Sequence, residues 1–212
     1  MLTEIFRALY LIRPQPAADG QTGFTYLLRR PAGNILLATK ADISSDAAAI
    51  AAVGGVSRIL LGDRHHAGPH TVALAQHFGV PLSASRDEAK ALAGKGIPVT
   101  EVIPYQRADW ADDLAVLPTP GHTKGALSYL WHNGGQRYLF IGDTLVPVDG
   151  GWDYWVTAIH RAQMQRTVLG LTDVAFDVIL SNSFAARPVA WLAVDADQRQ
   201  ALLQEVAARL AG

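Results

Sequence analysis

Three stretches of the sequence carry residue types that could hold a metal ion. LLGDRHHAGPH at 60–70 follows an apolar segment, and TPGHT at 119–123 and GDT at 142–144 lie in glycine-containing turns beside predicted strands. Since the chain has no cysteine, only imidazole and carboxylate groups could bind the ion. The candidate ligands are Asp63, His65, His66, His122 and Asp143, with His70 one helical turn further on.

Each stretch alone has an ordinary structural explanation. A histidine in a loop is more often solvated or hydrogen-bonded than a ligand, and an aspartate after a strand commonly forms a turn or caps a helix. On this alternative, His65, His66 and His70 hydrogen-bond to one another and to water. Only the three stretches taken together, in their order along the chain, can therefore indicate a metal site.

Composition limits the partners of the chain. The 212 residues have a formal net charge of −1, and no cluster of lysine and arginine would track a phosphate backbone. We therefore expect a small-molecule substrate, and neither nucleic acid nor a membrane as partner; a homo-oligomer is left open. The sequence shows no signal peptide and no apolar segment near the roughly 20 residues that span a bilayer, which predicts a soluble, cytoplasmic protein.

Helices alternate with strands along both halves of the chain. Apolar runs around the RRPAGN turn predict a hairpin at 24–38, and the opening stretch lies between a strand at 59–61 and a helix that begins at Pro69. Ser85 and Glu88 have capping-box spacing for a short helix, as do Asp197 and Gln200 for the last one. Further helices are predicted at 47–53, 157–169 and 197–210. We expect a single layered α/β domain over residues 1–212.

TPGHT followed by a strand, a turn, a second strand and GD resembles the metallo-β-lactamase superfamily. The resemblance implies an α/β (α+β) fold, a four-layer αββα sandwich with two mixed sheets flanked by helices. The family pattern His-x-His-x-Asp-His then falls on Leu61, Asp63, His65 and His66, so only the last position is retained. In this register Leu61 and Asp63 should both project toward His122.

The resemblance implies a hydrolase of a small ester, thioester, lactone or phosphoester-like substrate, which acts through a metal-bound water. The family's last histidine is replaced within 180–184, and leucine cannot coordinate a metal, so we expect a single divalent ion, either Zn, Mn or Fe. Asp63, His66, His122 and Asp143 would hold this ion. His65, also a candidate ligand, would serve as general base, which makes His65 and Asp143 the expected catalytic residues.

Two alternatives and three minor assignments stay open at this point. The chain could be a non-catalytic member of the fold, without metal, that acts as a binding or interaction module. A nucleotide-binding domain is disfavoured, because Gly54 and Gly55 precede a strand instead of joining a strand to a helix. Arg64 could clamp a substrate carboxylate or pair with Asp63 and Asp143. Aromatic residues of GGWDYW at 150–155 could line a substrate pocket or cap the core, and His160 could approach the site.

Overall fold

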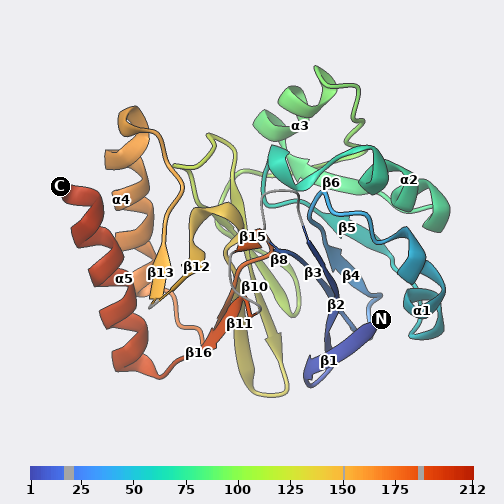
Figure 1. Ribbon diagram of the computed structural model, residues 1–212, viewed down its shortest axis with the longest axis horizontal. Helices are drawn as coiled ribbons and strands as arrows, with labels where there is room; N and C mark the ends of the chain where they lie inside the picture. The colour runs from blue at the N-terminus through green and yellow to red at the C-terminus, as the bar shows by residue number, and fades with distance from the viewer. Residues whose placement is uncertain (17–21, 150, 186–188) are drawn as a thin grey trace.

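Two β-sheets lie face to face, and helices cover their outer surfaces (Figure 1). The computed structural model describes residues 1–16, 22–149, 151–185 and 189–212. The helices on one side are α1 (Ala47–Ala52), α2 (Pro69–Phe78) and α3 (Arg86–Ala93), and those on the other are α4 (Arg161–Gly170) and α5 (Ala196–Ala211). The expected four-layer αββα sandwich is confirmed.

The first sheet has the strand order β1-β2-β3-β4-β5-β6-β7, and β15 (Phe184–Ala185) also pairs with β3. The bounds are β1 (Leu2–Phe6), β2 (Leu9–Pro16), β3 (Thr22–Leu28), β4 (Ile35–Leu37), β5 (Arg58–Leu60), β6 (Leu82–Ser85) and β7 (Glu101–Ile103). Strands β1 to β4 are antiparallel and β4 to β7 are parallel, so the sheet is mixed. The predicted hairpin at 24–38 is confirmed as β3–β4, whereas the hairpin β1–β2 was not predicted.

The second sheet has the order β16-β14-β11-β10-β9-β8, and the short ribbon β12–β13 stands apart from it. The bounds are β8 (Ala108–Ala111), β9 (Leu114–Pro118), β10 (Leu127–Asn133), β11 (Gln136–Phe140), β12 (Val146–Val148), β13 (Gly151–Asp153), β14 (Val178–Leu180) and β16 (Trp191–Ala193). TPGHT connects β9 to β10, and the GD turn follows β11. The two motifs therefore follow β9 and β11 of one sheet, which lie on either side of β10.

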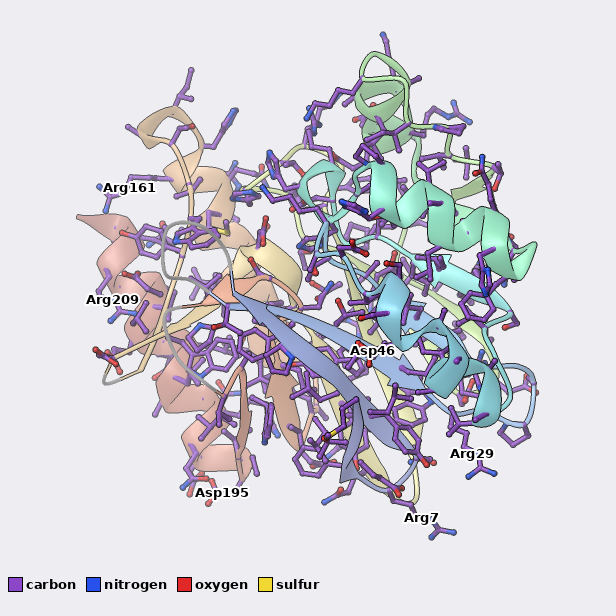
Figure 2. All side chains as sticks on the ribbon, turned by 45° about the vertical axis from the view of Figure 1, so that its right-hand side comes forward. Arg7, Arg29, Asp46, Arg161, Asp195 and Arg209 are labelled. Carbon is purple, nitrogen blue, oxygen red and sulfur yellow. The ribbon has the colours of Figure 1, made fainter. Side chains whose placement is uncertain are left out.

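Apolar side chains form one layer between the sheets and one beneath each group of helices. Tyr26 and Trp131 are buried between the sheets, Leu61 and Leu74 lie in the layer beneath the first group of helices, and Met164 lies beneath α4 and α5. Figure 2 shows side chains filling these layers, with Arg7, Arg29 and Asp195 at the periphery. Each sheet is thus buried on both faces, and each group of helices on the face toward its sheet.

The residues expected to begin and end α2 do so, whereas the capping box of the last helix and the start of the strand after α2 are shifted. Pro69 begins α2, and Gly79 ends it with a φ of +64°, as expected. The capping box of the last helix is formed by Asp195 and Gln198, two residues before the predicted pair, since the Asp195 carboxylate accepts the Gln198 N–H at 2.8 Å. The strand expected at 80–82 begins at Leu82, because the Val80 N–H is used to close α2 on the Ala75 carbonyl. No helix in the described part of the chain is both long and apolar enough to cross a bilayer.

Candidate metal centre

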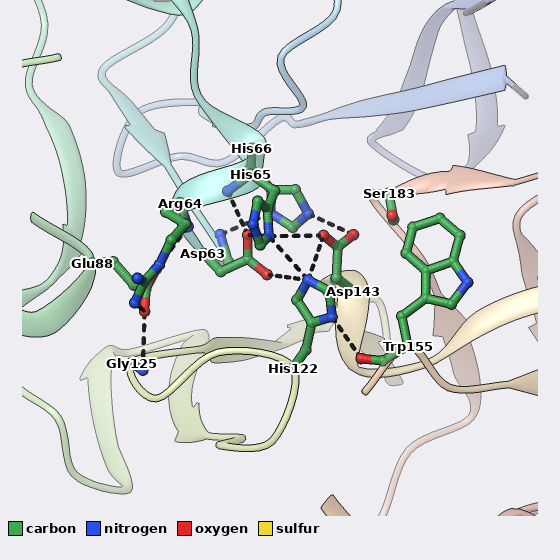
Figure 3. Close-up of polar contacts among 12 residues, drawn as sticks. Asp63, Arg64, His65, His66, Glu88, His122, Gly125, Asp143, Trp155 and Ser183 are labelled. Carbon is green, nitrogen blue, oxygen red and sulfur yellow. Dashed lines mark hydrogen bonds and ion pairs between the residues drawn. The ribbon is translucent and has the colours of Figure 1, made fainter. Parts of the chain in front are cut away.

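Four side chains from three separate turns meet at the edge of the two sheets (Figure 3). Asp63 and His65 follow β5, His122 lies in the β9–β10 connection, and Asp143 follows β11. One nitrogen or oxygen atom from each of the four lies within 4.8 Å of the corresponding atom of every other. Residues far apart in sequence thus form one compact group of metal-ligand types.

The turn after β5 is folded by its own polar groups. Asp63 caps a 3₁₀ turn, η2 (Arg64–His66), and its Oδ1 accepts the His65 N–H at 2.7 Å. Its side chain is almost fully buried, whereas 47% of the His65 side chain is exposed. This hydrogen bond therefore joins the buried Asp63 to the solvent-facing His65.

The ring of His122 is oriented by a backbone carbonyl. Its Nδ1 lies 2.6 Å from the Trp155 carbonyl oxygen, which can only accept, so Nδ1 carries the hydrogen and donates it. In the neutral ring, Nε2 then presents a lone pair to the group, 2.9 Å from Nδ1 of His65. A histidine that donates one ring N–H to a carbonyl while the other nitrogen faces acidic side chains is typical of metal ligands.

The distances between these atoms are close to those between the ligands of a metal ion. Nδ1 of His65 lies 3.4 Å from Asp63 Oδ1 and 3.7 Å from Asp143 Oδ2, while Nε2 of His122 lies 3.9 Å from Asp63 Oδ2 and 3.3 Å from Asp143 Oδ2. Tetrahedral ligands would be separated by about 3.3–3.4 Å, since Zn–N bonds are about 2.0–2.1 Å. The spacing of these donor atoms therefore suits metal coordination.

Asp143 sits in a turn that favours glycine at its first position. Gly142 begins the 3₁₀ turn η3 (Gly142–Thr144) with a φ of +59°, and a Cβ there would lie 3.1 Å from Cε1 of His66. The Gly142 carbonyl accepts the Ser181 hydroxyl at 3.0 Å. The glycine of the GD motif thus lets the carboxylate approach the buried histidine.

His66 is placed against Asp143 rather than inside the four-residue group. Its Nδ1 accepts the Gly62 N–H at 3.2 Å, so Nε2 carries the hydrogen and donates it to Asp143 Oδ1, also at 3.2 Å. Burial lowers the pKa of His66, and the Asp63 and Asp143 charges raise it to a net value of about 9. The Gly62 donor opposes that second proton, because it faces the nitrogen that would carry it.

The two carboxylates require a positive charge between them. Burial raises the pKa of Asp143, but the adjacent His66 and His122 rings outweigh burial and hold this pKa well below its usual value. Burial lowers the pKa of His122, whereas the hydrogen bond and charge of Asp143 raise it and prevail. The carboxylate of Asp143 thus stays ionised, and either protonated histidines or a cation must neutralise it.

The family register holds for Asp63 and fails for Leu61. Asp63 projects toward His122 as expected. Leu61 is fully buried and belongs to the apolar layer beneath the first group of helices, so its expected projection toward His122 is wrong. The far-end positions Asn182 and Ser183 are buried and carry no charge; Asn182 lies 3.5 Å from His66 Nδ1, and Ser183 lies near Asp143 in Figure 3. Among the described residues, the charged ligand types therefore gather around one position.

Other residues singled out in the sequence have different surroundings. His70 is exposed and lies 3.4 Å from Asp42, outside the group. Arg64 pairs with Glu88 instead of Asp63 and Asp143. Trp152 is buried in the core, whereas Trp155 is half-buried and its ring lies beside Asp143. His160 is exposed and lines a surface hollow of about 610 Å³ together with Gly121 and Thr123.

Sequence reasoning missed Glu88 as a residue near the centre. Its spacing from Ser85 was read as a helix cap, and the Ser85 hydroxyl does accept the Glu88 N–H at 3.4 Å. The Glu88 carboxylate, however, turns toward Arg64 and Gly125. The sequence around Glu88 does not indicate that its carboxylate accepts hydrogen bonds from other segments.

Solved structures share the fold of the chain, although no family model and no curated protein matches its sequence. A metallo-β-lactamase from Pontibacter korlensis has a TM-score of 0.77 at 16% identity, covering 100% of this chain and 99% of that one. A HARLDQ motif mutant of the metallo-β-lactamase from Cronobacter sakazakii has a TM-score of 0.71 at 16% identity, covering 100% and 95%.

A subclass B3 metallo-β-lactamase isolated from a soil metagenome library is also similar, with a TM-score of 0.68 at 16% identity and coverage of 96% of this chain and 91% of that one. In each case the likeness extends over nearly the whole of both chains. Together with the strand order and the position of the two turns, these comparisons establish the fold. The chain has the metallo-β-lactamase fold.

Proposed function

We propose that this protein is a metal-dependent hydrolase of a small ester, thioester, lactone or phosphoester-like substrate, with a single divalent ion at the Asp63, His65, His122 and Asp143 group. The observation that carries the proposal is the convergence of four donor atoms within 4.8 Å on a fold shared with metallo-β-lactamases. Such a spacing suits one ion, and hydrolysis is the chemistry implied by the sequence resemblance.

A bound divalent ion would act as a Lewis acid that polarises the substrate and lowers the pKa of a coordinated water. Two carboxylates in the ligand set offset the formal charge of a divalent ion, so we expect weaker acidification of that water than with three neutral histidines. An oxygen-richer set also favours Mn or Fe relative to an all-histidine site, while it still accepts Zn.

We assign His65 to the ion through Nδ1, because that atom lies 2.9 Å from Nε2 of His122 within the group. This assignment replaces the general-base role expected for His65, since one nitrogen cannot coordinate an ion and accept a proton together. His66 is assigned as the residue that orients Asp143, because it donates Nε2–H to Oδ1 and leaves Oδ2 facing His122. Asp143 thus contacts His66 through Oδ1 and faces His122 with Oδ2.

The surroundings of Asp143 suit a partly apolar substrate. The Trp155 ring lies on the side of Asp143 away from His65, and Ser183 lies next to that ring (Figure 3). An aromatic face offers a stiff apolar surface for an acyl or leaving group, and a buried hydroxyl can hydrogen-bond to a substrate oxygen. Because the Trp155 carbonyl also fixes His122, substrate contact and ligand orientation involve the same residue.

Metal content and turnover test this proposal together. Protein stripped with a chelator is supplemented separately with Zn, Mn or Fe, analysed for bound metal and assayed on chromogenic esters, thioesters, lactones and phosphoesters. We expect one equivalent of metal and metal-dependent hydrolysis, both lost in His122→Ala and both kept in His70→Ala, whose ring lies outside the group.

The alternative outcomes are distinct. Two tightly held ions per chain would contradict the single-ion assignment. One ion without turnover on any substrate, or no ion after supplementation, would favour the non-catalytic binding or interaction module. That alternative draws support from His66, whose two ring nitrogens already have partners within the protein.

A further inference from the structure

Glu88 is the most deeply buried acidic side chain near the centre, yet it is not one of the candidate ligands. It lies in the first turn of α3 and is 0% exposed. Its carboxylate forms a two-pronged ion pair with Arg64, with Oε2 accepting Nε at 2.7 Å and Oε1 accepting Nη2 at 2.8 Å. A buried carboxylate is costly unless it is fully paired, so this geometry stabilises its charge.

The same carboxylate also holds the backbone of two of the three ligand-bearing turns. Oε2 accepts the Arg64 N–H at 2.8 Å, and Arg64 stands between Asp63 and His65. Oε1 accepts the N–H of Gly125 at 3.0 Å, three residues after His122. Figure 3 shows Glu88 joined to both segments on the side of the centre away from Trp155.

The connection to Gly125 is close and reinforced. The Ser85 hydroxyl, at the start of the same helix, donates to the Gly125 carbonyl at 2.7 Å. A Cβ at position 125 would lie 2.5 Å from Ser85 Oγ and 2.7 Å from Glu88 Oε1, so only glycine permits this approach. The N–H and the carbonyl of Gly125 are therefore both held by side chains at the start of α3.

We propose that Glu88 is a positioning residue of the metal centre, which ties the turn that carries Asp63 and His65 to the turn that carries His122. Its hydrogen bonds hold the donor atoms at coordination spacing before an ion binds. This inference rests on the proposed function, because it concerns the affinity and geometry of the same site. Glu88 itself contacts no candidate ligand side chain and would not coordinate the ion.

The chain offers a matched control in Asp177. Its carboxylate accepts Nε of Arg137 at 3.0 Å, Nη2 at 2.6 Å and the Arg137 N–H at 2.8 Å. These are the contacts that Glu88 makes with Arg64, but they join β11 to the segment before β14, away from the ligand turns. Loss of such an arginine clamp can thus be separated from loss of the connection between ligand turns.

The test compares Glu88→Gln, Arg64→Lys and Asp177→Asn with the parent. Metal-free proteins are titrated calorimetrically with Zn and Mn, and the visible absorption spectrum of the Co-loaded forms reports coordination geometry. We expect Glu88→Gln to weaken binding about 10–100-fold, as losses of outer-sphere partners do, and to alter the Co spectrum. Arg64→Lys, which keeps the charge and loses the fork, should show a smaller effect in the same direction, and Asp177→Asn none.

Each outcome has one meaning. Unchanged affinity and an unchanged Co spectrum in folded Glu88→Gln would overturn the inference while leaving the proposed function intact, as would an equal loss in Asp177→Asn. If Glu88→Gln does not fold, Arg64→Lys decides, and parental binding by that variant overturns the inference. If the parent takes up no metal, the proposed function is wrong and the inference falls with it.

Discussion

Replacement of Asp143 by asparagine should separate metal binding from folding. The side chain is 6% exposed, with Oδ1 accepting Nε2–H of His66 at 3.2 Å and Oδ2 lying 3.3 Å from Nε2 of His122. The asparagine carbonyl can keep the first contact, and its amide can donate to the unprotonated Nε2 of His122. We therefore expect the free energy of unfolding of the metal-free protein to change by no more than about 1 kcal/mol.

Metal affinity should respond far more strongly. The substitution removes one of two carboxylates, so the ion loses a ligand atom together with half of its compensating negative charge. Loss of an outer-sphere partner costs about 10–100-fold in affinity, and loss of a direct ligand should exceed 100-fold, which corresponds to about 2.8 kcal/mol. Calorimetric titration with Zn and Mn measures the affinity, and thermal unfolding without metal measures the stability.

Asp149→Asn is the control, because it makes the same chemical change at an exposed position a few residues away. It should bind metal as the parent does. Parental affinity in Asp143→Asn would remove Asp143 from the ligand set and refute the reasoning. A collapse of stability without metal would show instead that the carboxylate serves the fold.

Three further predictions follow from single contacts. Leu61→His should not tighten zinc binding and should destabilise the protein by about 1–3 kcal/mol, because it buries an imidazole in an apolar layer; tighter binding in calorimetry would restore the family register. Gly121→Ala should cost about 1–3 kcal/mol in thermal unfolding, since φ is +151° and a Cβ would lie 2.8 Å from Sδ of Met164; an unchanged melting temperature would contradict this contact. Hydrogen bonds from Arg30 and Arg137 lower the pKa values of Asp113 and Asp177, so their contribution to stability is present above the unfolded pKa of about 3.9 and is lost as the pH falls through the lower folded values. Asp177→Asn should accordingly show a smaller loss of stability than the parent between roughly pH 6 and pH 3, and an equal loss would count against this ion pair.

The layered fold could be predicted because its signals are local. Pro69 and Gly79 delimit α2, and the RRPAGN turn sets the β3–β4 hairpin, without reference to the rest of the chain. The N-terminal hairpin escaped prediction because Glu4, Arg7 and Arg13 interrupt its apolar stretch, and β2 also pairs with the distant strand β3. Strand pairing of this kind depends on residues distant in sequence.

The candidate site was predicted in residue type and less well in arrangement. Asp63, His122 and Asp143 lie together because each follows a strand at the same edge of the sheets. His65 and His66 are adjacent in the sequence, so the sequence could not show which ring joins the ligand group and which orients Asp143. The difference depends on the Gly62 N–H, which donates to Nδ1 of His66. Of the two alternatives for Arg64, the pairing with Asp63 and Asp143 is wrong, because Glu88 reaches it from a helix more than twenty residues away.

Anomalous scattering from a crystal soaked with Mn or Zn tests the central claim most directly, because it locates the ion without reference to activity. We expect one strong peak per chain, within coordination distance of Asp63, His65, His122 and Asp143, with His66 still hydrogen-bonded to Asp143. Two peaks at the centre, a peak coordinated by His66 in place of His65, or no peak in a metal-soaked crystal would contradict it.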